Sequence, residues 1–278
     1  MLKPLELVER HVQHHVLLDD AVKRGQIGSN PAAGAILPKE EETDEDIDEV
    51  PKFLEKDQLL AVIRAAKDKA AEAERPRDAF GWRQFSRTVF ILAHTGMRIG
   101  ELGALEPVRI DTKKLTVKIA ATLYEKRGLR HYEIGPPKTK ESRRTIDISR
   151  RVADVFDAQL RDLKAFRLLS GSKYHTEREF AFVMPTSHLP GYPLRQSKIN
   201  DMLEEALEAA GIPRKLITAH GLRHTFTSLS AEAEVTLEDI QKQLGHASDE
   251  MTKRVYYHVT ETRRRANVDK LDALLGEF

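Results

Sequence analysis

Two histidines and an arginine lie close together in the stretch HGLRHTF, residues 220–226. On a helix, His220 would share a face with both Arg223 and His224. Such a group suits a metal site, a phosphate site or a solvated helix face. A zinc site of the H-E-x-x-H type needs glutamate where this chain has Gly221, which disfavours a metal. Arginine offers a fork of charged donors and histidine exchanges a proton near neutral pH, so the group favours a phosphate.

Two earlier stretches also carry side chains suited to phosphate chemistry. In TGMRIGE, Arg98 precedes Glu101 by three residues, a spacing that an ordinary ion pair on a short helix would also explain. In PPKTKESRRT, Lys138 lies in a turn between two predicted strands. That lysine either reaches a phosphate from the turn or belongs to a solvated basic hairpin.

Two later stretches complete the set of candidate residues. In LGHAS, His246 follows a glycine at a predicted helix end, where a histidine is also favoured by the helix dipole. In RVYYHV, Tyr256 and Tyr257 offer hydroxyl nucleophiles or simple aromatic packing. Neighbours on a helix point about 100° apart, so at most one of the two tyrosines can serve the same site.

Helices are the elements expected to position most of these residues. The apolar spacing of FLEKDQLLAVIRAAKDKAAEA and WRQFSRTVFILAHTG predicts two helices, the second stopped by Gly96. The runs KLTVKIAATLYE, RHYEIGPP and SRRTIDIS predict a small three-stranded antiparallel meander, and Thr236 with Asp239 predicts a capping box. The fold class is therefore mainly α, of the α+β type. Further helices are expected at 150–169, 197–210, 218–231, 236–244, 249–258 and 261–278.

The first 50 residues differ in character from the rest of the chain. A helix is predicted over residues 5–24, and GQIGSNPAAG ends it. The run KEEETDEDIDE, residues 39–49, contributes −7 to a net charge of only +1, so the remaining residues carry +8. A basic body with an acidic linker is compatible with a polyanionic partner. We expect an N-terminal helical segment at 1–38, an acidic linker at 39–50 and one dense domain at 51–278.

Composition excludes several classes of protein. The chain has no cysteine, so disulfides and thiolate metal sites are excluded and a cytoplasmic location is expected. No apolar run is long enough to span a membrane, and the N-terminus lacks the apolar core of a signal peptide.

Taken in chain order, the candidate residues resemble the signature of the tyrosine recombinase family, the phage integrase type. The matching blocks are TGMRIGELGAL, PPKTKESRRTI, HGLRHTF and LGHASDEMTKRVYYH, and the resemblance covers roughly Pro51 to Thr260. It implies a helical catalytic domain with a small three-stranded antiparallel sheet. The segment DDAVKRGQIGSNPAAGAILP resembles the last helix of the family's core-DNA-binding domain, which would make residues 1–38 a remnant of that domain.

The resemblance also implies a chemical role for each reacting group. Tyr256 would attack the scissile phosphate and form a 3′-phosphotyrosyl link. Its spacing from His246 favours it over Tyr257. Lys138 would protonate the leaving 5′-oxygen, and His220 would accept the tyrosine proton. No metal cofactor and no ATP are implied.

The remaining roles concern the phosphate and the DNA around it. Arg98 and Arg223 would hold the phosphate oxygens, His246 would hydrogen-bond the phosphate, and Glu101 would support the group as a neighbouring acid. His224 is interpreted as structural. Three further basic residues are expected to contact the DNA backbone: Lys140, Arg143 and Arg144.

The expected partners are double-stranded DNA attachment sites and, in the synaptic complex, three further copies of the chain. An excisionase or a host DNA-bending protein would fit the same family. The apolar residues of the last helix suit either packing within the chain or docking on a neighbouring copy. Two alternatives stay open, a DNA-relaxing enzyme similar to type IB topoisomerases and a catalytically silent DNA-binding module. The block PPKTKESRRTI favours integration and excision of a mobile element or phage.

Overall fold

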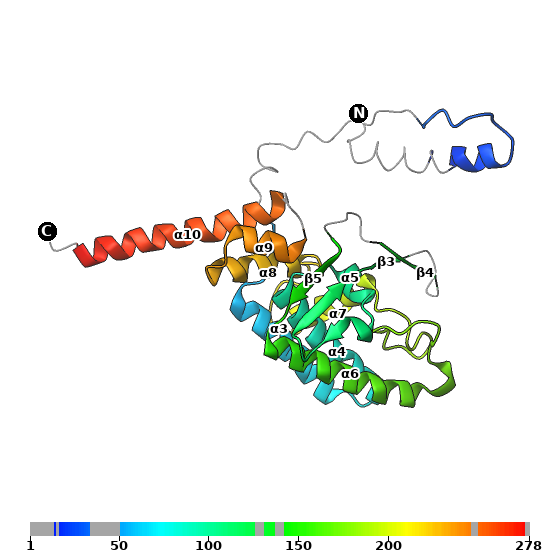
Figure 1. Ribbon diagram of the computed structural model, residues 1–278, viewed down its shortest axis with the longest axis horizontal. Helices are drawn as coiled ribbons and strands as arrows, with labels where there is room; N and C mark the ends of the chain where they lie inside the picture. The colour runs from blue at the N-terminus through cyan, green and yellow to red at the C-terminus, as the bar shows by residue number, and fades with distance from the viewer. Residues whose placement is uncertain are drawn as a thin grey trace. The chain divides into compact units, whose positions relative to one another are not determined.

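The computed structural model describes residues 14, 17–33, 51–125, 131–136, 142–245 and 250–275. The chain divides into two units, Met1–Glu49 and Val50–Phe278 (Figure 1). In the first unit, residues 17–23 are helical, and the Asn30 side chain donates to Asp19 at 2.6 Å. The acidic linker at 39–50 lies outside the described residues. The assignment of residues 1–38 to a DNA-binding remnant stays a prediction.

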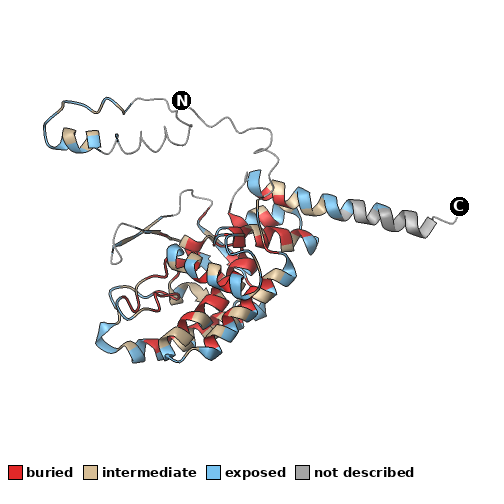
Figure 2. Ribbon diagram, turned by 180° about the vertical axis from the view of Figure 1, so that it is seen from behind, coloured by how far each residue is buried: buried red, intermediate tan, exposed pale blue. Residues whose placement is uncertain are grey.

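The second unit is mainly helical, as expected. Buried residues of its helices gather in the interior of this unit (Figure 2), where their apolar side chains form the core. None of the helices in the described ranges is both long and apolar enough to cross a membrane. The helices are α3 (Lys56–Glu72), α4 (Pro76–Thr95), α5 (Ile99–Gly103), α6 (Arg150–Ser170), α7 (Gln196–Ala209), α8 (Gly221–Glu232), α9 (Leu237–Leu244) and α10 (Glu250–Leu275).

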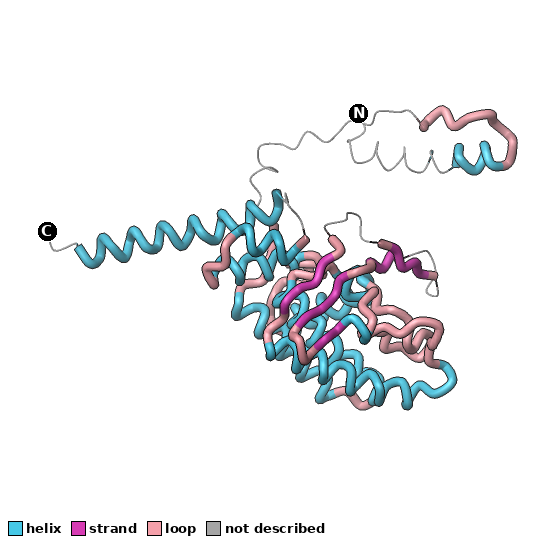
Figure 3. The backbone as a smooth tube through the Cα atoms, in the orientation of Figure 1, coloured by secondary structure: helices cyan, strands magenta, loops and turns pink. Residues whose placement is uncertain are grey.

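The strands are antiparallel, but they pair differently from the predicted meander (Figure 3). One sheet has the order β1-β2-β5, and β3 and β4 form a separate hairpin. The run KLTVKIAATLYE was expected to be one strand, and it instead supplies both β2 and β3. Leu123 continues the alternation of buried Val117 and Ile119, yet it packs against Gly103 of α5. The strands are β1 (Ile110–Asp111), β2 (Thr116–Ile119), β3 (Thr122–Glu125), β4 (Tyr132–Gly135) and β5 (Arg144–Asp147).

The end of the chain forms one helix where two were expected. α10 runs without a break through residues 258–262 and projects beyond the rest of the second unit (Figure 1). No glycine or proline interrupts it, and the β-branched threonines are accommodated by bonds to their own helix. Thr260 Oγ1 donates to the Tyr256 carbonyl at 3.0 Å, and Thr262 Oγ1 to the His258 carbonyl at 2.9 Å.

α4 is the central helix of this unit, and its C-terminal end fixes the place where the candidate residues begin. It packs against α3, α6 and α8. As predicted, it stops at Gly96, which adopts a left-handed φ of 63° and donates its N–H to the Leu92 carbonyl. A Cβ at Gly96 would lie 2.3 Å from Leu244 Cδ2 and 2.6 Å from Phe226 Cδ1. The position therefore requires glycine for both its backbone and its surroundings.

We expect Gly96→Ala to lower the free energy of unfolding by about 3 kcal/mol, from left-handed strain plus forced repacking. Gly211→Ala is the matched control, because Gly211 also has a positive φ, 72°, with nothing within 4 Å of an added Cβ. That control should lose only about 1 kcal/mol in urea unfolding. Equal losses at the two positions would show that contact with Leu244 and Phe226 does not constrain the turn.

Candidate active site

The turn after α4 places Arg98 and Glu101 together. Arg98 directly precedes α5, and Glu101 reaches back to it from within that short helix. The Arg98 backbone N–H donates to Glu101 Oε2 at 2.9 Å, and Arg98 Nη1 donates to Oε1 at 2.7 Å. The ion pair expected from the spacing is therefore present. The Arg98 side chain keeps 27% exposure, whereas that of Glu101 has none.

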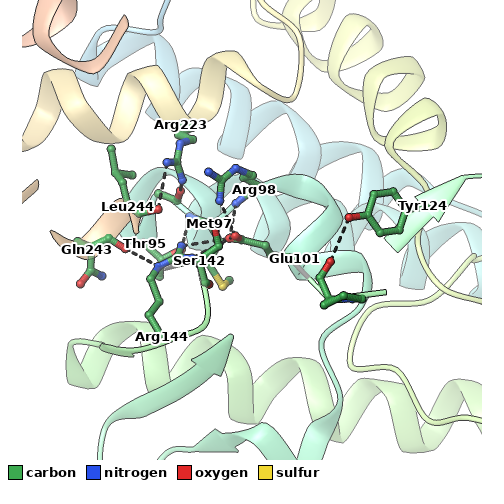
Figure 4. Close-up of polar contacts among 12 residues, drawn as sticks. Thr95, Met97, Arg98, Glu101, Tyr124, Ser142, Arg144, Arg223, Gln243 and Leu244 are labelled. Atoms are coloured by element: carbon green, nitrogen blue, oxygen red, sulfur yellow. Dashed lines mark hydrogen bonds and ion pairs between the residues drawn. The ribbon is translucent and has the colours of Figure 1, made fainter. Parts of the chain in front are cut away.

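A second arginine, from a distant strand, also binds the Glu101 carboxylate. Arg144, the first residue of β5, donates from Nη1 to Oε1 at 3.0 Å and from Nη2 to Oε2 at 3.1 Å (Figure 4). Burial by itself would raise the pKa of Glu101. The hydrogen bonds and charges of Arg144 and then Arg98 outweigh it, so the pKa is lowered. The carboxylate is thus held ionised between two cations.

Arg223 joins this group from the first turn of α8. It is buried, with 4% exposure, and donates from Nη1 to the Gly96 carbonyl at 2.6 Å and from Nη2 to the Leu244 carbonyl at 3.1 Å (Figure 4). The first of these bonds attaches Arg223 to the turn that leads into Arg98. The two arginines expected to hold a phosphate therefore lie on connected segments, although 125 residues separate them in the sequence.

His220 lies just outside the helix that was expected to contain it. α8 begins at Gly221, and the His220 carbonyl accepts the first-turn N–H of Arg223 at 2.9 Å. His220 is exposed, and its ring lies 5.0 Å from the ring of His224, edge to face. The histidine expected to accept a proton thus reaches solvent at the start of the helix that carries Arg223.

The two tyrosines of α10 have different surroundings. Tyr256 is half-buried and packs against a cluster of Phe226, Ile240 and Leu244, which come from α8 and α9. Tyr257 is 57% exposed. Packing therefore restrains the Tyr256 ring beside the residue whose carbonyl Arg223 binds, which favours Tyr256 as the positioned hydroxyl.

Several expected site residues lie outside the described residues, namely Lys138, Lys140 and His246. Arg143 is exposed. Arg144, expected to contact DNA, instead has a side chain only 8% exposed that donates to the protein's own groups. A signal for this was available in the sequence, because Arg144 shares strand parity with the apolar Ile146 and Ile148.

The chemistry of the two arginines suits an oxyanion. Arg98 and Arg223 supply fixed positive charge beside a protein interior, where it acts more strongly than in water. Within the part of the chain that the structure describes, no group of three or more His, Cys, Asp and Glu residues is placed to hold a metal ion.

We expect Glu101→Gln to lower the free energy of unfolding at neutral pH by about 3 kcal/mol, because it leaves two enclosed guanidinium groups without their counter-charge. The folded-state pKa of Glu101 is below its ordinary 4.5, so its stabilisation is complete above about that pH. It is lost as the pH falls through the folded pKa. The urea unfolding midpoints of wild type and variant should therefore converge as the pH falls below 4.5.

The exposed Glu74 gives a matched control, because Glu74→Gln removes a carboxylate that lies at the surface. Its stability should follow the wild type at every pH. A deficit for Glu101→Gln that stays constant from neutral to acid pH would contradict the ionised, doubly paired carboxylate.

Comparison with known proteins places these features in a family. The model of the phage integrase family matches residues 52–263. The integrase of Staphylococcus phage L54a is 33% identical over 246 residues, which cover 86% of this chain and 66% of that protein. The transposase from transposon Tn916 of Enterococcus faecalis is 28% identical over 190 residues, 66% of this chain and 44% of that protein. The chain thus spans no more than about two thirds of the length of these relatives.

Solved structures show the same fold. The Tn1549 transposon integrase, in complex with circular intermediate DNA, superposes with a TM-score of 0.63 at 20% identity, covering 96% of this chain and 83% of that one. XerA recombinase gives a TM-score of 0.56 at 20% identity, covering 80% of this chain and 66% of that one. The expected fold class, mainly helical with a small antiparallel sheet, is therefore confirmed.

Proposed function

Because the chain belongs to the phage integrase family, we propose that it is a site-specific DNA recombinase acting through a 3′-phosphotyrosyl intermediate. One observation carries the proposal. Arg223 Nη1 donates to the carbonyl of Gly96, two residues before Arg98, so one hydrogen bond attaches Arg223 to the turn that leads into Arg98. A pair of fixed cations with a restrained tyrosine nearby suits attack on a phosphodiester.

In the cleavage step, the Tyr256 hydroxyl attacks the phosphorus of the scissile phosphate. The new bond joins the phenolic oxygen to phosphorus, and the bond to the 5′-oxygen breaks. A tyrosine hydroxyl has a pKa near 10, so about one in a thousand is ionised at pH 7, a deficit of roughly 4 kcal/mol. His220 accepts the phenolic proton, and Lys138 gives a proton to the leaving 5′-oxygen.

The phosphate gains negative charge on its non-bridging oxygens as the tyrosine attacks. Arg98 and Arg223 stabilise that charge, with a hydrogen bond from His246, and Glu101 keeps Arg98 in place. In the rejoining step, a 5′-hydroxyl from a second duplex attacks the phosphotyrosine and releases Tyr256. One ester replaces another at each step, so the reaction requires no ATP. Arg98, Arg223 and Lys138 supply the positive charge that a metal ion would otherwise provide.

We place the reaction on double-stranded attachment sites, in a synaptic homotetramer, during integration and excision of a phage or mobile element. Names of the relatives support this setting, since they include a phage integrase and a transposon transposase. An excisionase or a host DNA-bending protein would direct the reaction. The recombinase would act in the cytoplasm of a bacterial or phage-infected cell. Lys140 and Arg143 would contact the DNA backbone.

The nucleophile is tested with nicked duplexes, selected by binding from a random-sequence library. A nick lets the short cleaved fragment diffuse away, so the adduct accumulates. We expect wild type and Tyr257→Phe to form a covalent adduct that survives denaturation. Tyr256→Phe should bind the same duplexes without forming it, because it lacks the attacking oxygen. An adduct with Tyr256→Phe but none with Tyr257→Phe would assign the nucleophile to Tyr257.

The same assay separates the competing functions. Adduct formation should be unchanged by EDTA, and a requirement for metal would contradict the mechanism. Exchange of strands between two selected sites distinguishes a recombinase from an enzyme that only relaxes supercoiled plasmid. Binding without any adduct from the wild-type chain would identify a silent DNA-binding module.

A further inference from the structure

Arg143 and Arg144 are neighbours in the sequence but have opposite surroundings. Successive side chains of a strand point to opposite faces. On β5, Ile146 is buried and pairs with Val117 of β2, and Arg144 shares that face. The Arg143 side chain is exposed, whereas that of Arg144 is 8% exposed. Of these two arginines, only Arg143 has the exposed side chain that a contact with DNA requires.

The Arg144 guanidinium binds three separate parts of the protein. Its fork meets both oxygens of Glu101, at 3.0 and 3.1 Å. Nε donates to the Gln243 carbonyl at 2.7 Å, and Nη1 also donates to the Ser142 carbonyl at 3.1 Å. These four hydrogen bonds use all but one of the N–H donors of an arginine. The side chain has little capacity left for a DNA phosphate.

Arg144 also changes the electrostatic balance around Arg98. A single arginine facing a buried carboxylate forms a neutral pair, whose field on a nearby phosphate is weak. With Arg144 sharing Glu101, the three groups together carry one positive charge. Arg98 can thus be held in place by Glu101 while the group keeps the charge needed to attract an oxyanion.

The contact of Arg144 with the Gln243 carbonyl fixes the end of α9. The last carbonyls of a helix lack intrahelical partners and carry partial negative charge, which suits a cation. Arg144 binds the Gln243 carbonyl, and Arg223 binds the next one, that of Leu244. Two arginines therefore set the point from which the chain leaves α9 toward the segment that contains His246.

We propose that Arg144 is a positioning residue for the cleavage reaction and not a DNA contact. It holds the Glu101 carboxylate that orients Arg98, and together with Arg223 it holds the end of α9. This inference rests on the proposed function and adds to it a residue that acts through Arg98 and α9.

Salt dependence of DNA binding separates the two roles of an arginine. The probe is a labelled random-sequence duplex of about 30 base pairs, long enough to cover a basic face. Arg143→Ala should lower the slope of log affinity against log salt by about one unit, because it removes a phosphate contact. Arg144→Ala should leave the slope unchanged. A slope lowered by about one unit in Arg144→Ala would overturn the proposal.

Rate measurements test positioning directly. With saturating nicked duplex, Arg144→Lys should slow formation of the covalent adduct on the order of a hundredfold, because lysine keeps the charge but lacks the fork. Affinity for the duplex should be retained. A wild-type rate in Arg144→Lys would overturn the proposal. If Arg144→Ala fails to fold by circular dichroism, Arg144→Gln replaces it in the salt measurement, because glutamine also removes the charge.

The two proposals can fail separately. If the wild-type chain forms no adduct with any selected duplex, the proposed recombinase function is wrong. The salt slopes are still decisive in that case. A slope lowered in Arg144→Ala assigns Arg144 to DNA binding and overturns the positioning role. If the slope is unchanged in Arg144→Ala and lowered in Arg143→Ala, the result supports an Arg144 side chain that binds the protein's own groups.

Discussion

A carboxylate enclosed away from water must be matched by donors on both oxygens, and Glu101 imposes this requirement on the site. Arg98 and Arg144 satisfy it together, from a turn and a strand that are far apart in the sequence. A buried ion pair of this kind contributes little net stability compared with apolar packing, because desolvation offsets the attraction. Its value lies in orientation, since the carboxylate can accept from both guanidinium groups only when α5 and β5 are correctly placed.

Unsatisfied helix carbonyls provide the second organising constraint. α9 ends with acceptors that have no partners within the helix, and buried arginines supply donors to Gln243 and Leu244. The Gly96 carbonyl, just past the end of α4, is bound in the same way by Arg223. Arg144 and Arg223 therefore also satisfy the backbone carbonyls at helix ends, besides any role in binding a ligand. Each arginine is held rigidly before any phosphate arrives, which reduces the ordering cost of binding.

Local patterns were sufficient to predict the elements that are set by short-range chemistry. Gly96 ends α4, as the sequence indicated. Of the predicted capping box at the start of α9, Thr236 accepts the N–H of Asp239, whereas the Asp239 carboxylate accepts from the Thr236 hydroxyl. Contacts between segments that are distant in the sequence were harder to predict from local patterns. Leu123 continues the period-two alternation of the preceding strand, so its departure to pack on α5 leaves no local signal. Arg144 was assigned to the surface by its charge, although its parity with Ile146 indicated an inward position.

Leu244 connects the proposed nucleophile to the arginines that are proposed to bind the phosphate. Its side chain packs with Phe226 against Tyr256, while its carbonyl accepts a hydrogen bond from Arg223. The same side chain lies over Gly96, where a Cβ would come within 2.3 Å of it. The ends of α4 and α9 therefore meet at one residue, with α8 and α10 packed around it. A shift of α9 would move the tyrosine and release a guanidinium together, so the position of this helix end governs both halves of the proposed chemistry.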